Sequence, residues 1–132
     1  MTFETDQDLI REKKAIEAFV SLFGGSYKKL DPNDIDYKIF DKQGNLISYA
    51  EVKGRIRTIY NAYPLPIAAK KMVKLIDKRL SPVAIWACED GIIYGKVNKL
   101  KGEIKWGKNS PLDSELMIYY DKQKELKYVR YS

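Results

Sequence analysis

Two acidic residues and a lysine near residue 50 have the types and spacing for metal-assisted chemistry. The stretch from Asp36 to Lys53, DYKIFDKQGNLISYAEVK, predicts a β-hairpin. If Gln43-Gly44 is the centre of the turn, Asp36 lies opposite Glu51, and Asp34 lies opposite Lys53. Because side chains alternate along a strand, these charged groups share one face of the hairpin. Several carboxylates on one face cost free energy unless a cation or water neutralises them.

A carboxylate in the N-terminal part of the chain adds a third acidic candidate. Residues 5–23 predict a helix, and Glu12 falls within its apolar stripe. Carboxylates such as those of Glu12, Asp36 and Glu51 suit Mg²⁺ or Mn²⁺, with water and phosphate oxygens completing the coordination. Such a metal polarises a phosphate and lowers the pKa of a bound water, and Lys53 would orient that water or stabilise transition-state charge. The pattern indicates phosphodiester hydrolysis.

The absence of histidine narrows the chemistry further. The chain has no histidine and one cysteine, Cys88, which excludes His-based triads and His- or Cys-ligated zinc sites. Any metal must therefore be held by oxygen ligands, which favours Mg²⁺, Mn²⁺ or Ca²⁺. Cys88 follows an apolar run and is expected to be an inert core thiol. This cysteine usage fits a cytoplasmic protein.

Length and charge set the broad class. The 132 residues, 45% of them apolar, predict one domain over 1–132 with a real core. The sequence contains no run of 18 or more apolar residues, so no membrane span is expected. The first residues do not resemble a signal peptide. The net charge of +6 favours an anionic partner, with nucleic acid the first expectation.

The remaining elements alternate between helix and strand. Residues 65–80 predict a second helix, and 83–88 and 92–97 predict strands, the first of them central and buried. The part from 98 to 132 reads as a β-rich extension that ends in a hairpin or paired edge strands within 116–131. The order predicts an α/β domain with a mixed sheet flanked by helices.

The run Asp36, then fourteen residues, then Glu51-Val52-Lys53, resembles the PD-(D/E)XK nuclease superfamily. Within it the chain is most similar to archaeal-type Holliday junction resolvases and related phage or restriction-like endonucleases. The resemblance covers about residues 8–97 and implies a restriction-endonuclease-like fold. It also implies that Glu12, Asp36 and Glu51 bind Mg²⁺ or Mn²⁺ and that Lys53 assists catalysis. The chain departs from the family pattern in having isoleucine, not proline, before Asp36.

Basic residues follow the motif and recur in the second predicted helix. The resemblance implies that a lysine early in that helix, here Lys70 or Lys71, supports the site. Arg55 and Arg57 come directly after the motif, and arginine matches phosphate bidentately. Together with Lys74, these residues are expected to contact the DNA backbone. The alternative for both groups is a solvent-exposed basic surface.

Three functions fit these features. The first is a metal-dependent DNA endonuclease, acting as a homodimer through the C-terminal strands or the region of Trp106. The second is a non-catalytic nucleic-acid-binding module on a nuclease-like scaffold, and the third is a protein-interaction domain.

The register of the hairpin affects the choice between these functions. A two-residue shift of the turn would place Lys53 opposite Asp36, and Asp34 competes with Asp36 as the first ligand.

Overall fold

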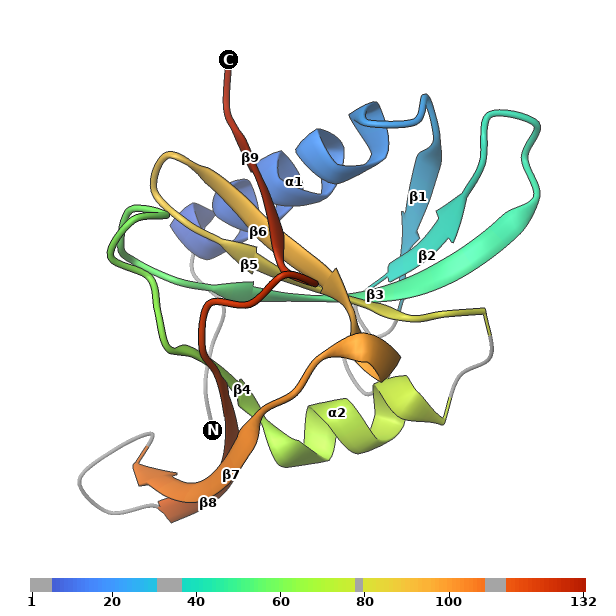
Figure 1. The fold of residues 1–132 in the computed structure, drawn as a ribbon. Coiled ribbons are helices and arrows are strands. Elements are labelled where there is room, and N and C mark those ends of the chain that lie inside the picture. The colour runs from blue at the N-terminus through green and yellow to red at the C-terminus, as the bar shows by residue number, and fades with distance from the viewer. Residues whose placement is uncertain (1–5, 31–36, 78–79, 109–113) are drawn as a thin grey trace.

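A mixed six-stranded sheet forms the centre of the molecule, with a helix on each face (Figure 1). The computed structural model describes residues 6–30, 37–77, 80–108 and 114–132. Its elements, in chain order, are α1 (Asp6–Ser21), β1 (Ser26–Lys29), β2 (Tyr37–Phe40), β3 (Leu46–Gly54), β4 (Leu65–Ala68), α2 (Ala69–Ile76), β5 (Val83–Ala87), β6 (Gly91–Lys96), the 3₁₀ turn η1 (Val97–Lys99), β7 (Glu103–Lys108), β8 (Ser114–Tyr120) and β9 (Lys127–Arg130). The α/β class predicted from the sequence is confirmed.

The large sheet has the strand order β1-β2-β3-β5-β6-β9. Only β3 and β5 pair in parallel, and all other neighbours in this sheet are antiparallel. A small antiparallel sheet, β4-β8-β7, lies with α2 below the large sheet in Figure 1, whereas α1 lies above it. No helix among the described segments is long and apolar enough to cross a membrane.

Strand β5 separates two hydrophobic cores. All five of its residues are buried, and they alternate between the faces of the sheet. Ile85 packs with Ile16 and Phe19 of α1 in one core. Trp86 packs in the other core with Leu75 of α2, and its indole Nε1 donates a 2.8 Å hydrogen bond to the carbonyl of Pro66 in β4. The near-continuous apolar run of β5 is therefore explained by burial on both faces.

The predicted hairpin forms with the expected register. Tyr37 pairs with Ala50 and Lys38 with Tyr49, which matches a turn centred on Gln43-Gly44. The apolar back of the ribbon is also confirmed, because Tyr37 and Ala50 are buried in the α1 core. Two of the candidate acids, Asp34 and Asp36, lie outside the described residues, so their positions remain sequence predictions.

The turn of this hairpin is held by one side chain. Asp41 Oδ1 accepts hydrogen bonds of 2.9 Å from the backbone N–H groups of Gln43 and Asn45. Hydrogen bonding from Asn45, the largest cause, holds the pKa of Asp41 below its usual value. Gly44 takes a φ of +85°, a conformation that glycine adopts without a Cβ clash.

The second helix is shorter than the predicted range of 65–80, and the prediction is wrong for residues 65–68. Residues 65–68 form strand β4, and the helix occupies only Ala69–Ile76. Pro66 explains the difference, because proline has no N–H and favours an extended residue before it. The backbone of β4 instead pairs with β8, where Leu65 lies opposite Tyr120.

The C-terminal strands also pair differently from the prediction. β8 pairs with β4 and β7 in the small sheet, and β9 pairs with β6 at the edge of the large sheet. The two strands therefore belong to different sheets and do not form a hairpin together. Cys88, by contrast, is buried as expected, and burial raises the pKa of its thiol to about 11.

Two neighbouring residues of α2 test the α2 core. Leu75 is fully buried, whereas Ile76 is 60% exposed. We expect Leu75→Ala to lower the free energy of unfolding by about 2–5 kcal/mol, because it removes buried methyl groups and leaves a cavity. Ile76→Ala, the matched control, should change it by less than about 1 kcal/mol. Urea denaturation measures both, and equal losses would contradict the described packing of α2.

Candidate functional site

Glu51 is a buried carboxylate on the α2 side of the sheet. Its neighbour Ala50 packs in the α1 core, so alternation along β3 directs Glu51 to the opposite face. The residue is only 5% exposed. Its Oε1 lies 3.4 Å from Nζ of Lys71 in α2, which forms an ion pair. A buried carboxylate requires such compensation, because its transfer from water is costly.

A pocket of about 380 Å³ opens beside Glu51. A second ion pair lies at this pocket, with Lys70 Nζ 3.5 Å from Oε1 of Glu115 in β8. Lys53, two residues after Glu51 on the same face of β3, is exposed at the pocket. We call this the Glu51 pocket, and its lining residues are Glu51, Lys53, Ile67, Ala68, Lys70, Lys71, Glu115 and Met117.

The chain topology brings these side chains together. A parallel pair such as β3–β5 requires a crossover connection, and α2 lies in that connection. The helix begins at Ala69, so Lys70 and Lys71 lie in its first turn, next to β3. The antiparallel pairing of Ala68 with Met117 then carries Glu115 to the same place.

Glu115 is the site residue that the sequence did not reveal. It lies in the part of the chain that the family resemblance does not cover. A local signal was present, because Glu115 and Met117 are two residues apart and share one face of a strand. That signal could not show which element the face would meet.

A second hollow continues from the Glu51 pocket. It has a volume of about 430 Å³ and shares Lys53 and Met117 with that pocket. We call it the Lys53 groove, and its lining residues are Lys53, Gly54, Arg55, Ile56, Pro66, Met117 and Tyr119. Lys53 therefore lies where the two hollows meet, so an elongated ligand could reach the Glu51 pocket along the groove.

Of the five predicted DNA-contacting residues, Lys70 and Lys71 form the ion pairs of the Glu51 pocket, and the other three differ in exposure. Arg55 is committed to the fold, because its Nε donates to the carbonyl of Ala62 at 2.8 Å and its Nη2 to that of Pro64 at 3.2 Å. Burial is the largest cause that lowers the pKa of Arg55. Arg57 and Lys74 are exposed to solvent. Their placement is compatible with backbone contacts, and that role remains a prediction.

Glu12 is not brought to Glu51. Its side chain lies on the α1 side of the sheet, where Tyr37 Oη donates a 2.7 Å hydrogen bond to Glu12 Oε1. Lys29 Nζ lies 3.2 Å from the same oxygen. Glu12 therefore has its partners between α1, β1 and β2, on the opposite face of the sheet from the Glu51 pocket.

The Glu51 pocket combines lysines, which attract anions, with carboxylates, which attract cations. Its three lysines carry three positive charges against the two negative charges of Glu51 and Glu115. The described residues contain no group of three or more His, Cys, Asp or Glu side chains that could hold a metal ion. The two carboxylates supply the oxygen donors that a hard cation prefers. No family model, curated protein or solved structure matches the chain.

A double-mutant cycle tests the Glu51–Lys71 pair. We expect Lys71→Met to lower the free energy of unfolding by about 1–3 kcal/mol, because it removes the ammonium from a buried carboxylate. Lys71→Met should lower the free energy of unfolding by less when Glu51→Gln is already present. The difference between the two losses is the coupling energy of the pair. The exposed Lys13–Glu17 pair, 3.9 Å apart, is the control and should show less than about 0.5 kcal/mol. A coupling no larger than the control's would refute the role of this pair.

Proposed function

We propose that this protein is a metal-dependent DNA endonuclease of the PD-(D/E)XK type, which hydrolyses phosphodiester bonds. The observation that carries the proposal is the Glu51 pocket. It joins a buried carboxylate and a lysine two residues later on one strand face with the first-turn lysines of the next helix. These are the residue types and the order of the Glu-x-Lys part of the motif and of the supporting lysine, whereas Asp36 lies outside the described residues. Branched or duplex DNA is the proposed substrate, as the net charge of +6 favours.

The order of elements supports a restriction-endonuclease-like fold. A helix, a three-stranded antiparallel meander, a second helix and a strand parallel to the third strand follow one another as α1, β1, β2, β3, α2 and β5. The helix, hairpin, second helix and buried strand predicted from the sequence occur in this order, with β1 and β4 as additions. The motif residues Glu51 and Lys53 lie on β3, beside the parallel partner β5.

The proposed cofactor is Mg²⁺ or Mn²⁺. Glu51 and Glu115 would hold the ion, and Asp36, which lies outside the described residues, is the further ligand predicted from the sequence. Glu115 would replace Glu12, which lies on the other face of the sheet. When bound, the ion would polarise the scissile phosphate and lower the pKa of a coordinated water.

The lysines of the pocket would act on the substrate. Lys70 and Lys71 neutralise the carboxylates in the ion-free protein, and a bound cation would release their ammonium groups toward phosphate oxygens. Lys53 would bind the phosphate at the junction of the pocket and the Lys53 groove and stabilise the charge that develops in the transition state. Arg57 and Lys74 would contact the flanking backbone.

Cleavage of plasmid and branched DNA tests the proposal. We expect the wild type to cut with Mg²⁺ or Mn²⁺ and to be inactive in EDTA. Glu51→Gln and Lys53→Met should each slow cleavage about 100-fold or more, because each removes a group that acts on the reacting phosphate. Glu103→Gln, which changes an exposed carboxylate in β7, is the matched control and should leave the rate unchanged. Thermal unfolding verifies that every variant is folded.

A non-catalytic nucleic-acid-binding module is the second candidate. The two ion pairs favour it, because they neutralise Glu51 and Glu115 without a metal. The same assay separates the candidates. DNA binding without cleavage by the folded wild type would exclude the endonuclease and leave the binding module. Cleavage that Glu51→Gln and Lys53→Met do not affect would exclude the Glu51 pocket as the site of the reaction.

Symmetric cutting of two strands requires two copies of the site, so we propose a homodimer. Trp106 is 74% exposed on β7, the edge strand of the small sheet, and Leu116 lies opposite it on β8. Such an exposed apolar face favours contact with a second copy.

Light scattering tests the dimer. The wild type should have twice the mass of one chain, and Trp106→Lys should shift it to the monomer, because the substitution places a charge in the proposed interface. Tyr60→Lys is the matched control, since Tyr60 is 89% exposed and lies in the connection between β3 and β4, outside the small sheet. A monomeric wild type, both alone and with DNA, would count against the homodimer.

A further inference from the structure

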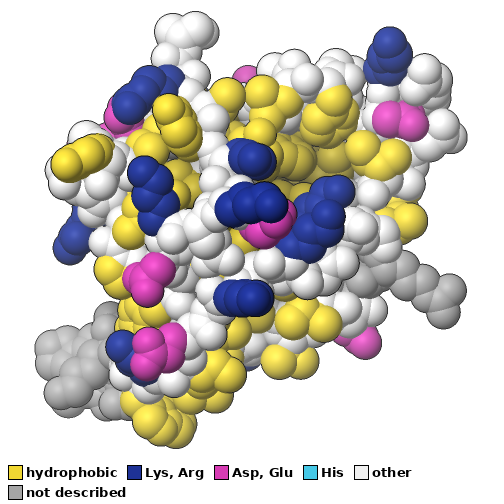
Figure 2. All heavy atoms as spheres, viewed as in Figure 1, with side chains coloured by type: hydrophobic (Ala, Val, Ile, Leu, Met, Phe, Trp, Pro, Cys, Tyr) yellow, Lys and Arg dark blue, Asp and Glu magenta, His cyan; other side chains and the backbone are white. Residues whose placement is uncertain are grey.

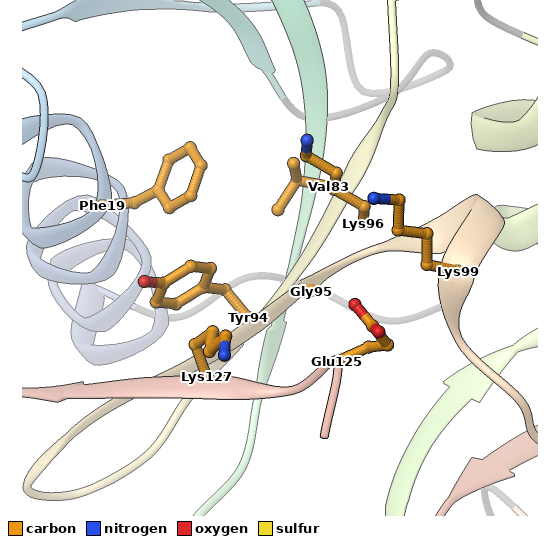
Figure 3. A pocket seen from close by; sticks show the side chains of 8 residues that line it. All are labelled: Phe19, Val83, Tyr94, Gly95, Lys96, Lys99, Glu125 and Lys127. Carbon is orange, nitrogen blue, oxygen red and sulfur yellow. The ribbon is translucent and has the colours of Figure 1, made fainter. Parts of the chain in front are cut away.

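A separate pocket of about 260 Å³ lies on the α1 side of the large sheet. Figure 3 shows Phe19, Tyr94 and Lys127 on one side of the space around Gly95, and Val83, Lys96, Lys99 and Glu125 on the other side. We call it the Gly95 pocket, and its lining residues are Phe19, Val83, Tyr94, Gly95, Lys96, Lys99, Glu125 and Lys127. It shares no residue with the Glu51 pocket.

The floor of the Gly95 pocket is apolar and aromatic. Phe19 of α1 and Tyr94 of β6 meet edge to face, with ring centroids 5.4 Å apart and planes at 69°. Val83, the first residue of β5, lies across the space from these rings in Figure 3, and both Phe19 and Val83 are buried, so Tyr94 offers the more exposed ring. A floor of this kind accepts a flat ring, because aromatic side chains gain from contact with another ring beyond the area they bury.

The rim of the pocket is positively charged. Lys96, Lys99 and Lys127 are exposed, and none of them has an ion-pair partner within the described segments. Glu125 is the single carboxylate of the rim, so three positive charges face one negative charge. Figure 2 shows basic side chains gathered around an acidic one beside a hydrophobic hollow, over β6 and β9. An excess of two positive charges complements a phosphate monoester, which carries about −1.5 to −2 at pH 7.

The carboxylate of Glu125 limits the choice of ligand. A purely anionic ligand would gain from the lysines but would be repelled by Glu125. A ligand with an amino group would donate a hydrogen bond to the Glu125 carboxylate, as the exocyclic amine of cytosine does to carboxylates. A flat aromatic ring, an amino group and a phosphate together describe a nucleotide with an amino base.

We propose that the Gly95 pocket binds one such nucleotide, with its base against Phe19 and Tyr94, its amine toward Glu125, and its phosphate among the lysines. The nucleotide comes either free or as one unit of a single strand, because both present the same groups. This inference does not rest on the endonuclease proposal. The pocket lies on the other face of the sheet and needs no metal.

Amide NMR titrations in EDTA test this site apart from any metal-dependent activity. dCMP should shift the amide signals of Gly95, Lys96 and Glu125. Inorganic phosphate and deoxycytidine should each bind about tenfold or more weakly, because each lacks one half of the contacts. dTMP should also bind more weakly than dCMP, because thymine has no exocyclic amine.

Variants assign the contacts. Lys96→Gln combined with Lys99→Gln should weaken dCMP binding about tenfold. Lys42→Gln combined with Lys122→Gln is the matched control, since both lysines are exposed outside the pocket, and it should retain wild-type affinity. Glu125→Gln should abolish the preference for dCMP over dTMP. The spectrum of each variant also reports whether it is folded.

An octamer of deoxycytidylate identifies the source of the nucleotide. Tighter binding of the octamer than of dCMP, with the same amides shifted, would assign the pocket to a single strand. Equal or weaker binding would assign it to a free nucleotide. The proposal is overturned if neither ligand shifts these amides at millimolar concentration, if inorganic phosphate binds as tightly as dCMP, or if the Lys96 and Lys99 variant binds dCMP like the wild type.

Discussion

The parallel pairing of β3 with β5 is the constraint on which the Glu51 pocket depends. Two parallel neighbours cannot be joined by a tight turn, so the chain must cross one face of the sheet between them. It does so through β4 and α2, and this crossing places Lys71 against the buried Glu51. Strand β4 in turn recruits β8, which carries Glu115 to the pocket. The β3–β5 pairing thus underlies the Glu51–Lys71 pair, and the β4–β8 pairing adds the Lys70–Glu115 pair.

The two faces of the large sheet have different chemistry as a result. On the α1 face, Glu12 is held by Tyr37 and Lys29, and the Gly95 pocket lies toward the other edge of the sheet with its lysines. On the α2 face, both carboxylates of the Glu51 pocket are balanced by lysines from the same helix. The chain is basic overall, and each face carries a pocket lined by lysines. This supports nucleic acid or its components as the proposed ligands.

Burial of Glu51 is the costly feature of this arrangement. A carboxylate that is 5% exposed loses most of its hydration, and the ion pair with Lys71 offsets part of that loss. Core packing alone would be served better by an apolar residue at this position, since replacement of buried ion pairs by apolar groups is often neutral or stabilising. The retention of charge beside a pocket therefore favours a function for Glu51 over a purely structural role.

Local rules sufficed for some of these features. Alternation along a strand placed Glu51 and Lys53 on one face, and the turn at Gln43-Gly44 predicted the register observed between β2 and β3. Both follow from interactions between residues near in sequence. The same local reasoning predicted α1 and the buried β5, but it extended the second helix over Pro66.

Tertiary structure alone decided the remaining features, because they depend on contacts between residues far apart in the chain. The pairing of β8 with β4 brought in Glu115, and the packing of α1 carried Glu12 to the opposite face. The closing of the loop after β3 turned Arg55 toward backbone carbonyls. Residue types and spacing thus determined which groups could do chemistry on β3, whereas the fold determined which partners they meet.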